Sequence, residues 1–388
     1  MKILKSLTLL LALSCLCSTQ AQEVIVGAQA YEEYLPLLKG KKAAIFSNHT
    51  GMVGNEHTLD ILIKNKVEVI AIFSPEHGFR GDADAGEHVS SSVDKKTGIP
   101  IRSLYDGASG KPSRKSMQDF DVLIVDIQDV GLRYYTYYAS MVELMEACAE
   151  NNKSMLILDR PNPTGHYVDG PIMDMQYKSH VGYLPIPTVH GMTLGELATM
   201  VNGEQWLPNN LQCKLEVILC KNYTHQTMYN LPIPPSPNLP NMASIYLYAS
   251  ICYFEATPVS LGRGTELPFQ IYGHPKMKGY SYSFTPKSVS GAKKPPQLGN
   301  LCHGVDLSKL SEGELLAKKI DLSYLIDAYT NLKMGDKFFT PFFEKLSGAA
   351  YIRTMIIEGK SAQEIQDTWK DDVAKFKKQR APYLLYKE

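Results

Sequence analysis

A carboxyl group and an imidazole are adjacent in the segment SPEHGFRGDADAGE, residues 74–87. The preceding run VEVIAIF is rich in β-branched residues and is typical of a buried strand, so Glu76 is expected just beyond a strand end. Partial desolvation there raises the pKa of a carboxyl group and makes it a usable general acid near neutral pH. We therefore predict Glu76 as a catalytic residue, with His77 and Arg80 beside it. The alternative is an ordinary loop carboxylate that pairs with Arg80.

Two further carboxyl groups are candidates for a second catalytic group. Asp126 ends the apolar run DVLIVD, and Glu266 lies in the glycine-rich stretch LGRGTELPF. Glycoside hydrolysis generally uses a pair of carboxyl groups. If a site lies between two domains, Glu266 would face Glu76 and complete such a pair. An ion pair that braces the turn explains Glu266 equally well.

The stretch DIQDVGLRYYTYYASM combines an arginine with four tyrosines within five residues. Tyrosine rings pack against sugar rings, and an arginine can clamp a carboxylate. The alternative is the start of an amphipathic helix whose tyrosines pack in the core, and four tyrosines cannot all face one ligand. From this stretch, and from the polar residues that follow other apolar runs, we predict these binding residues: Asn48, His49, Gln128, Asp129, Arg133, Tyr134, Tyr137, Asp159, Arg160, Asn162, His190 and Arg263.

The motifs of several other classes do not occur in the sequence. No GxGxxG follows a strand, and neither GxxxxGK[ST] nor GxSxG is present, which argues against nucleotide binding and serine hydrolysis. His49, His77 and His190 are candidate metal ligands, but without HExxH spacing zinc is disfavoured. The acidic cluster DADAGE lacks the spacing of a calcium loop. We therefore expect neither a metal nor another cofactor.

Apolar runs near residues 42, 67, 121 and 154 alternate with stretches of helical spacing such as 56–66. This alternation predicts an α/β fold, a doubly wound and mostly parallel sheet covered on both faces. Ligands bind beyond the carboxyl ends of the strands in such sheets, so the polar residues that end the runs should gather at one edge. Thr193 and Glu196 have the spacing of a capping box and predict the start of another helix.

The length of 388 residues favours two domains. The proline-dense segment LPIPPSPNLPN, residues 231–241, is a stiff and extended stretch unsuited to a helix or a central strand. We place the domain boundary there. The predicted units are a larger domain over 22–235 and a smaller α+β domain over 236–388.

The N-terminus, MKILKSLTLLLALSCLCSTQA, has the basic start, apolar stretch and small-residue end of a secretory signal. We predict cleavage after Ala21 and a periplasmic or secreted protein, with lipidation at Cys15 as the alternative. The apolar stretch is shorter than the roughly 20 residues that a membrane span requires. Forty basic side chains match forty acidic ones, so charge gives no argument for nucleic-acid binding. The five later cysteines have no CxxC spacing and predict no disulfide framework.

Seven motifs in order, from about residue 25 to the C-terminus, resemble one bacterial family, the exo-β-N-acetylmuramidase glycoside hydrolases. They are SNHTG, SPEHGFRGDADAGEHV, DIQDVGLRYYTYYASM, LDRPNPTG, VHGMTLGELA, SPNLPN and FEATPVSLGRGTELPFQIYGHP. The resemblance implies a Rossmann-like N-terminal domain, a smaller C-terminal domain, a cleft between them and no nucleotide cofactor. It also implies release of N-acetylmuramic acid from the non-reducing ends of peptidoglycan fragments, with the family's proposed catalytic Glu at Glu76.

Muramic acid carries a lactyl carboxylate, which would give Arg80, Arg133 or Arg263 a reason to lie in a sugar site. Two other classes fit parts of the sequence. A periplasmic sugar- or muropeptide-binding protein would use two α/β lobes to capture a ligand without turnover. A metal-dependent amidase would act on the peptide stem and lose activity with EDTA.

Overall fold

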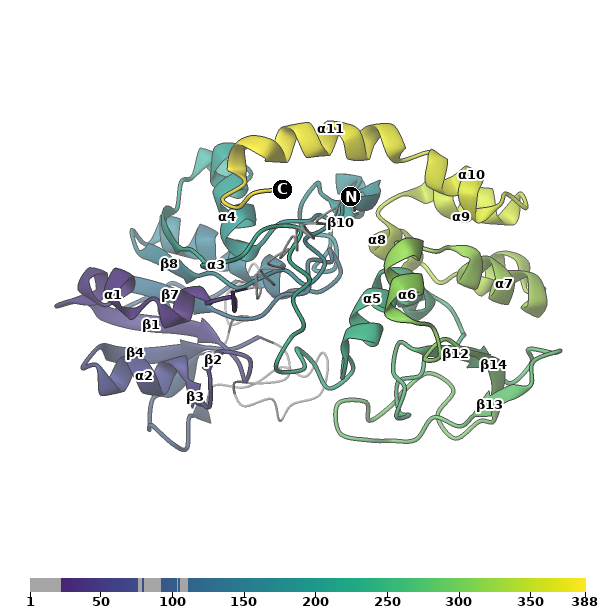
Figure 1. Ribbon diagram of the computed structural model, residues 1–388, viewed down its shortest axis with the longest axis horizontal. Coiled ribbons are helices and arrows are strands. Elements are labelled where there is room, and N and C mark those ends of the chain that lie inside the picture. The colour runs from purple at the N-terminus through teal and green to yellow at the C-terminus, as the bar shows by residue number, and fades with distance from the viewer. Residues whose placement is uncertain (1–21, 76–78, 80–91, 103, 105–110) are drawn as a thin grey trace, which may run out of the picture.

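The computed structural model describes residues 22–75, 79, 92–102, 104 and 111–388 (Figure 1). Its larger lobe is built on a seven-stranded sheet with the order β11-β8-β7-β1-β4-β6-β5. The first six strands in this order are parallel, and β5 pairs antiparallel to β6 at the edge. The strands are β1 (Lys42–Ser47), β4 (Glu68–Phe73), β5 (Ser92–Val93), β6 (Pro100–Arg102), β7 (Val122–Asp126), β8 (Ser154–Leu158) and β11 (Lys214–Ile218).

The central strands are buried on both faces, as the near-continuous apolar runs predict. Successive side chains of a strand point to opposite faces, so Ala43 and Ile45 of β1 join one core cluster while Ala44 and Phe46 join the other. Helices α1 (Tyr31–Tyr34) and α2 (Thr58–Lys64) contribute to the first cluster, and α3 (Tyr137–Glu150) and α4 (Leu194–Gly203) to the second. The doubly wound α/β fold is confirmed.

Helix α4 begins as its sequence predicts. The Thr193 hydroxyl accepts a hydrogen bond from the Glu196 amide at 3.2 Å, and the Glu196 carboxylate accepts one from the Thr193 amide at 2.9 Å. Smaller elements complete this lobe: η1 (Gly27–Gln29), η2 (Pro36–Leu38), β2 (Met52–Val53), β3 (Glu56–His57), β9 (Asp169–Ile172), η3 (Met175–Tyr177), β10 (Pro187–Val189) and η4 (Pro208–Asn210).

The second lobe combines a small antiparallel sheet of order β12-β14-β13 with a group of helices. Its strands are β12 (Ile271–His274), β13 (Tyr282–Phe284) and β14 (Cys302–Asp306). Its helices are α5 (Met242–Ile251), η5 (Cys252–Ala256), α6 (Glu312–Lys318), α7 (Ser323–Leu332), η6 (Gly335–Phe338), α8 (Phe343–Ser347), α9 (Ala350–Ile357), α10 (Ala362–Asp367), α11 (Lys370–Arg380) and η7 (Ala381–Tyr383).

The end of the chain returns to the larger lobe. Helix α11 runs from the second lobe back across the molecule, and the C-terminus lies beside α4 (Figure 1). The Tyr386 hydroxyl donates to Asp159 Oδ2 at 2.7 Å, and the Leu385 amide donates to Glu196 Oε1 at 2.9 Å. The predicted division at residues 235 and 236 stays a prediction, since the last residues pack on the first lobe.

The described residues include the helices given above and five cysteines. None of their helices is both apolar enough and long enough to cross a bilayer. Their five cysteines are all buried and none is in a disulfide.

Candidate functional site

The strand order reverses between β1 and β7, and ligands bind at such a switch point in doubly wound folds. Asn48 directly follows β1, and its Oδ1 accepts hydrogen bonds from the Thr50 amide at 2.9 Å and the Thr50 hydroxyl at 2.6 Å. Thr50 Oγ1 in turn accepts from the Gln128 amide beyond β7, at 3.0 Å. Thr50 therefore ties the two loops together, a role that no motif in the sequence indicated.

The proline-rich linker is held at this same edge. His49 Nε2 contacts the Pro234 carbonyl at 2.9 Å, and the Pro235 carbonyl accepts from the hydroxyls of Tyr135 at 2.8 Å and Tyr137 at 3.4 Å. Tyr137 also accepts from Asn48 Nδ2 at 3.0 Å. The predicted binding residues Asn48, His49 and Tyr137 thus hold the connection between the lobes.

Asp126, a candidate catalytic group, is fully buried and paired with Arg160. Its Oδ1 accepts from Arg160 Nε at 2.6 Å and its Oδ2 from Arg160 Nη2 at 3.1 Å. A carboxylate with both oxygens on one guanidinium and no exposed surface does not reach a substrate. The structure therefore favours a structural role for Asp126, which neutralises Arg160 and so avoids an uncompensated buried charge. Its catalytic role stays a prediction.

Asp129 differs from Asp126 because one of its oxygens is unpaired. Oδ1 accepts from the Gly131 amide at 2.7 Å, whereas the buried Oδ2 has no hydrogen-bond partner. Burial raises the pKa of Asp129 to about 7. Its neighbour Gln128 donates through Nε2 to the carbonyls of Asp129 and Pro161, both at 2.8 Å. Asp129 is thus a carboxyl group at the switch point that titrates near neutral pH.

The raised pKa of Asp129 predicts a pH-dependent stability. Between about pH 4, where an unfolded Asp ionises, and pH 7, only the unfolded state loses the proton, so this group makes the fold less stable as pH rises. Asp129→Asn removes the ionisation. Relative to wild type, the variant should gain up to about 4 kcal/mol between pH 4 and pH 8, measured by urea unfolding at both values.

Asp174→Asn is the matched control for this experiment. Hydrogen bonds from the Gln176 backbone amide and side chain lower the pKa of the exposed Asp174, so ionisation of Asp174 stabilises the fold as pH rises. Because the lowered pKa lies below the unfolded value of about 4, nearly all of this effect falls below pH 4, and the control should change little relative to wild type between pH 4 and pH 8. Equal pH responses of the two variants would contradict a raised pKa at Asp129.

The arginine and first tyrosine of the aromatic stretch are core residues. Arg133 is fully buried, and Nη1 donates to the carbonyls of Pro171 and Ile186 at 2.8 and 2.9 Å. Nη2 donates to those of Leu346 and Ser347 at 3.0 and 2.8 Å. The Tyr134 hydroxyl donates to the Ala249 carbonyl of α5. These contacts join the lobes and occupy the Tyr134 hydroxyl and both terminal nitrogens of Arg133, whereas Arg133 Nε has no hydrogen-bond partner among the described residues. They favour a structural role for both residues over sugar binding.

Asp159, Asn162 and His190 lie in a buried network around the start of α4. Asp159 accepts from Thr193 Oγ1 at 2.6 Å and from the Gly195 amide at 3.0 Å, and burial raises its pKa to about 6. Asn162 donates to the Met192 carbonyl at 2.9 Å. His190 Nδ1 accepts from the Met192 amide at 3.2 Å, and burial lowers the pKa of this histidine to about 3. The network holds the loop before α4 in place, and Asp159 also accepts a hydrogen bond from Tyr386 near the C-terminus.

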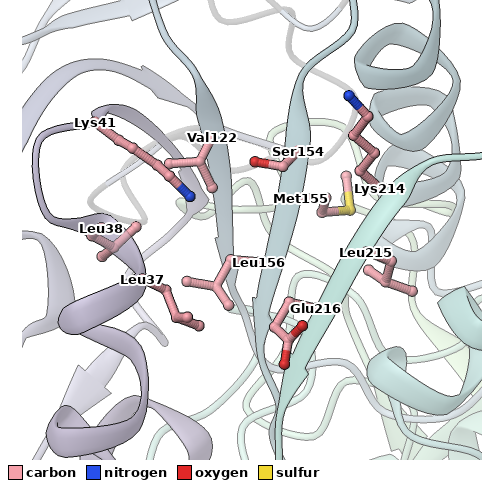
Figure 2. A pocket seen from close by; sticks show the side chains of 10 residues that line it. All are labelled: Leu37, Leu38, Lys41, Val122, Ser154, Met155, Leu156, Lys214, Leu215 and Glu216. Atoms are coloured by element: carbon pink, nitrogen blue, oxygen red, sulfur yellow. The ribbon is translucent and has the colours of Figure 1, made fainter.

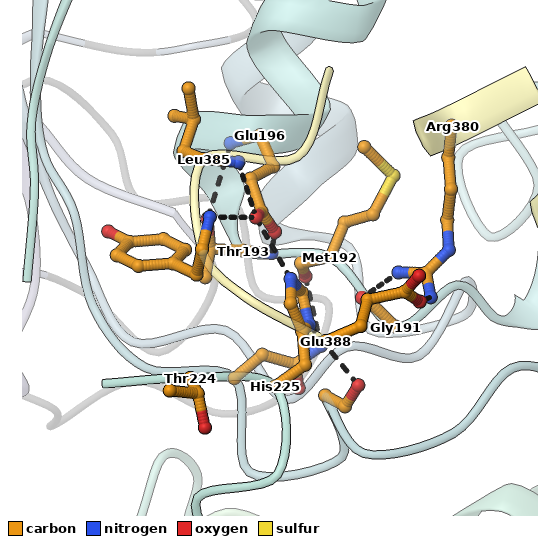
Figure 3. Close-up of polar contacts among 12 residues, drawn as sticks. Gly191, Met192, Thr193, Glu196, Thr224, His225, Arg380, Leu385 and Glu388 are labelled. Atoms are coloured by element: carbon orange, nitrogen blue, oxygen red, sulfur yellow. Dashed lines mark hydrogen bonds and ion pairs between the residues drawn. The ribbon is translucent and has the colours of Figure 1, made fainter. Parts of the chain in front are cut away.

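Figure 3 shows the neighbouring part of this network. Glu196, fully buried, pairs with His225 Nε2 at 2.9 Å and accepts the Leu385 amide with the same Oε1. Arg380 of α11 binds the Gly191 carbonyl and Glu388. The sequence analysis found only the capping role of Glu196, since nothing local to it indicates partners near residues 225 and 385.

In the second lobe, Arg263 pairs with Glu255 and not with Glu266. Arg263 Nη2 lies 2.6 Å from Glu255 Oε1, and its guanidinium lies 5.0 Å from the centre of the Phe269 ring. Glu266 itself is exposed. Gly262 and Gly264 have φ values of +84° and +80°, and an added Cβ would lie 2.4 Å from a carbonyl oxygen at either position. The glycines of this motif therefore shape the turn that carries Glu266.

Three predicted site residues, Glu76, His77 and Arg80, lie outside the described residues. The strand that leads to them is described: β4 ends at Phe73, next to β1, and Ser74 is buried. Among the residues that the structure describes, no group of three or more His, Cys, Asp or Glu side chains is arranged to hold a metal ion.

Two of the clefts in the described part of the chain lie at opposite edges of the sheet. One of about 300 Å³ lies at the amino ends of β7, β8 and β11, where Val122, Ser154 and Lys214 begin their strands (Figure 2). The other, of about 400 Å³, lies at the carboxyl edge and includes Gln128 and Arg160. Only the second is at the edge where doubly wound sheets bind ligands.

A doubly wound sheet with a polar carboxyl edge, joined by a linker to a second lobe, defines a two-lobed α/β protein of the class that binds ligands at that edge. Comparison with known proteins is more specific. The chain belongs to the exo-β-N-acetylmuramidase NamZ family: the N-terminal family model matches residues 43–243 and the C-terminal model matches 246–386.

Individual relatives agree with this assignment. The chain is 37% identical over 373 residues to the peptidoglycan β-N-acetylmuramidase NamZ of Bacillus subtilis, which covers 91% of this chain and 89% of the relative. The crystal structure of a DUF1343 family protein from Bacteroides fragilis is 66% identical, with a TM-score of 0.89 over 95% of this chain and 100% of the other. A second such protein from the same species is 29% identical, with a TM-score of 0.76 over 94% and 99%.

Proposed function

We propose that this protein is an exo-β-N-acetylmuramidase, a glycoside hydrolase that releases N-acetylmuramic acid from the non-reducing ends of peptidoglycan fragments. The observation that carries the proposal is the similarity to the Bacillus subtilis enzyme along nearly the whole of both chains. Both domains of the family are present, so the second lobe that would close the site is included.

The residues of the reaction are proposed from the sequence and the described edge of the sheet. Glu76, which comes three residues after the end of β4 in the sequence, is the proposed general acid or base. Of the two candidates for the second carboxyl group, Asp126 is held by Arg160 whereas Glu266 is exposed, so Glu266 is the preferred one. Separations near 5 Å between two catalytic carboxyl groups indicate retention, and about 6.5 to 9.5 Å indicates inversion.

The test of the function is release of free N-acetylmuramic acid from a disaccharide of N-acetylmuramic acid and N-acetylglucosamine, with and without EDTA. The disaccharide contains no peptide, so cleavage reports the glycosidic bond alone. Cleavage that resists EDTA supports the proposal. Binding of the disaccharide without cleavage would instead indicate a sugar-binding protein. Activity only on the peptide stem, and lost with EDTA, would indicate an amidase.

We further propose that the protein is exported, on the basis of the signal-like N-terminus. N-terminal sequencing and intact mass of the protein recovered from its native membrane and soluble fractions test this. A soluble chain that begins at Gln22 is expected. A lipid-modified chain that begins at Cys15 would favour the lipoprotein alternative, and an uncleaved chain in the cytoplasm would contradict export.

A further inference from the structure

The cleft at the carboxyl edge of the sheet has features of a ligand site. Its volume of about 400 Å³ falls in the roughly 300–1,000 Å³ range of small-molecule sites. It lies between the N-terminal segment, the loop after β1 and the segment that leads into the linker. The lining residues used below are Glu23, Gln128, Arg160, Tyr229 and Ile233.

Arg160, a largely buried residue, provides a hydrogen-bond donor to this cleft. Its Nε and Nη2 are engaged by Asp126, and Nη2 also donates to the Met52 carbonyl at 3.0 Å. Among the described residues Nη1 has no hydrogen-bond partner, although Arg160 is only 8% exposed. Asp126 and the Met52 carbonyl therefore hold the guanidinium through Nε and Nη2, and the N–H groups of Nη1 remain available to a ligand in the cleft.

Two further groups complement this donor. Gln128 uses its Nε2 for two carbonyls, which leaves Oε1 as an acceptor on the cleft wall. Tyr229 also lines the cleft and contributes an aromatic ring and a hydroxyl. Burial raises the pKa of Tyr229, and the charge of Arg160 lowers it by a smaller amount. Donor, acceptor and aromatic ring together match the requirements of a sugar.

The charges of the cleft decide which kind of sugar it suits. Asp126 neutralises Arg160. Glu23 at the rim is exposed and makes no salt bridge within the described chain, so it adds a negative charge. A ligand carboxylate would meet a net negative environment and would be disfavoured. The acceptor oxygens of hydroxyl and acetamido groups carry no such penalty.

We propose that this cleft binds an uncharged N-acetylated hexosamine. Under the proposed function, on which this inference rests, that residue is the N-acetylglucosamine of the substrate, whereas N-acetylmuramic acid carries a lactyl carboxylate. The two sugars share one ring and one acetamido group. They therefore form a matched pair of probes: only N-acetylmuramic acid carries the negative charge that the cleft is expected to disfavour.

The experiment measures binding of N-acetylglucosamine and N-acetylmuramic acid separately, by NMR titration of the full-length mature protein. Ile233→Trp fills the cleft without touching the Asp126–Arg160 pair and should weaken N-acetylglucosamine binding at least about tenfold. Tyr229→Phe removes one hydroxyl and should weaken it about two- to tenfold, the size of one neutral hydrogen bond. Binding of N-acetylmuramic acid should be unchanged in both variants.

Leu37→Trp is the matched control, because it places the same side chain in the cleft at the opposite edge of the sheet (Figure 2). It should leave both sugars bound as in wild type. Equal N-acetylglucosamine binding by the two Trp variants would overturn the site. Loss of N-acetylmuramic acid binding alone in Ile233→Trp would overturn the charge selection.

Turnover of the disaccharide separates this inference from the proposed function. The KM of Ile233→Trp should rise while kcat stays within about twofold, as expected when a ground-state contact is removed. If wild type cleaves the disaccharide and the KM of Ile233→Trp is unchanged, the cleft proposal fails and the function stands. If wild type does not cleave it, the function fails whatever the sugar titrations show.

Discussion

Glu76→Gln should reduce release of N-acetylmuramic acid from the disaccharide at least about a hundredfold, the loss expected when a general acid or base is removed. Glutamine keeps the shape of the side chain but can no longer exchange a proton at neutral pH. In the sequence, Glu76 comes three residues after the end of β4, a strand that lies beside β1 at the switch point. Initial rates at saturating substrate measure the loss in kcat.

Glu87→Gln is the control, with the same substitution in the same segment. The Glu87→Gln variant should retain most of the activity if Glu76 is the residue that acts as the general acid or base. Loss of N-acetylglucosamine binding by Glu76→Gln would indicate a general disturbance of the site, since that titration involves no proton transfer. Full turnover by Glu76→Gln would remove this residue from the mechanism and leave the enzyme class in place.

The sheet was predictable from the sequence because its strands are buried on both faces. The apolar runs near residues 42, 67, 121 and 154 became β1, β4, β7 and β8. In contrast, β5 and β6 have two and three residues, too few to produce a recognisable pattern. Near the C-terminus the chain forms two helices, α10 and α11, and Trp369 at their junction donates through Nε1 to Asp169 Oδ1 at 2.8 Å.

The location of the polar residues at the carboxyl edge was predictable from the sequence, but their hydrogen-bond partners were not. The polar residues that end the apolar runs do lie together in the loops after β1, β7 and β8, at the carboxyl edge of the sheet. Which side chains remain open to a ligand depends on hydrogen-bond partners far along the chain. His49, for example, contacts the Pro234 carbonyl, and the hydroxyls of Tyr135 and Tyr137 donate to the Pro235 carbonyl. A local pattern carries no information on such contacts, so residues that hold the linker looked the same as residues that bind a ligand.

Arg133 shows how a charged residue can satisfy a binding pattern and still be structural. Four backbone carbonyls from two lobes accept its terminal N–H groups. Gly348 has φ +76°, and a Cβ there would lie 2.6 Å from Arg133 Nη2. Glycine at that position therefore lets the backbone close around the guanidinium, which excludes a ligand carboxylate from it.

Arg133→Met should accordingly destabilise the protein by at least about 3 kcal/mol, because several buried carbonyls lose their donor at once. Urea unfolding followed by circular dichroism measures the change. Arg353→Met is the control: Arg353 is one-third exposed and pairs with Glu344 at 3.1 Å, so its loss should cost below about 1 kcal/mol. A stable Arg133→Met protein with a raised KM for the disaccharide would contradict the structural role and restore Arg133 to the sugar site.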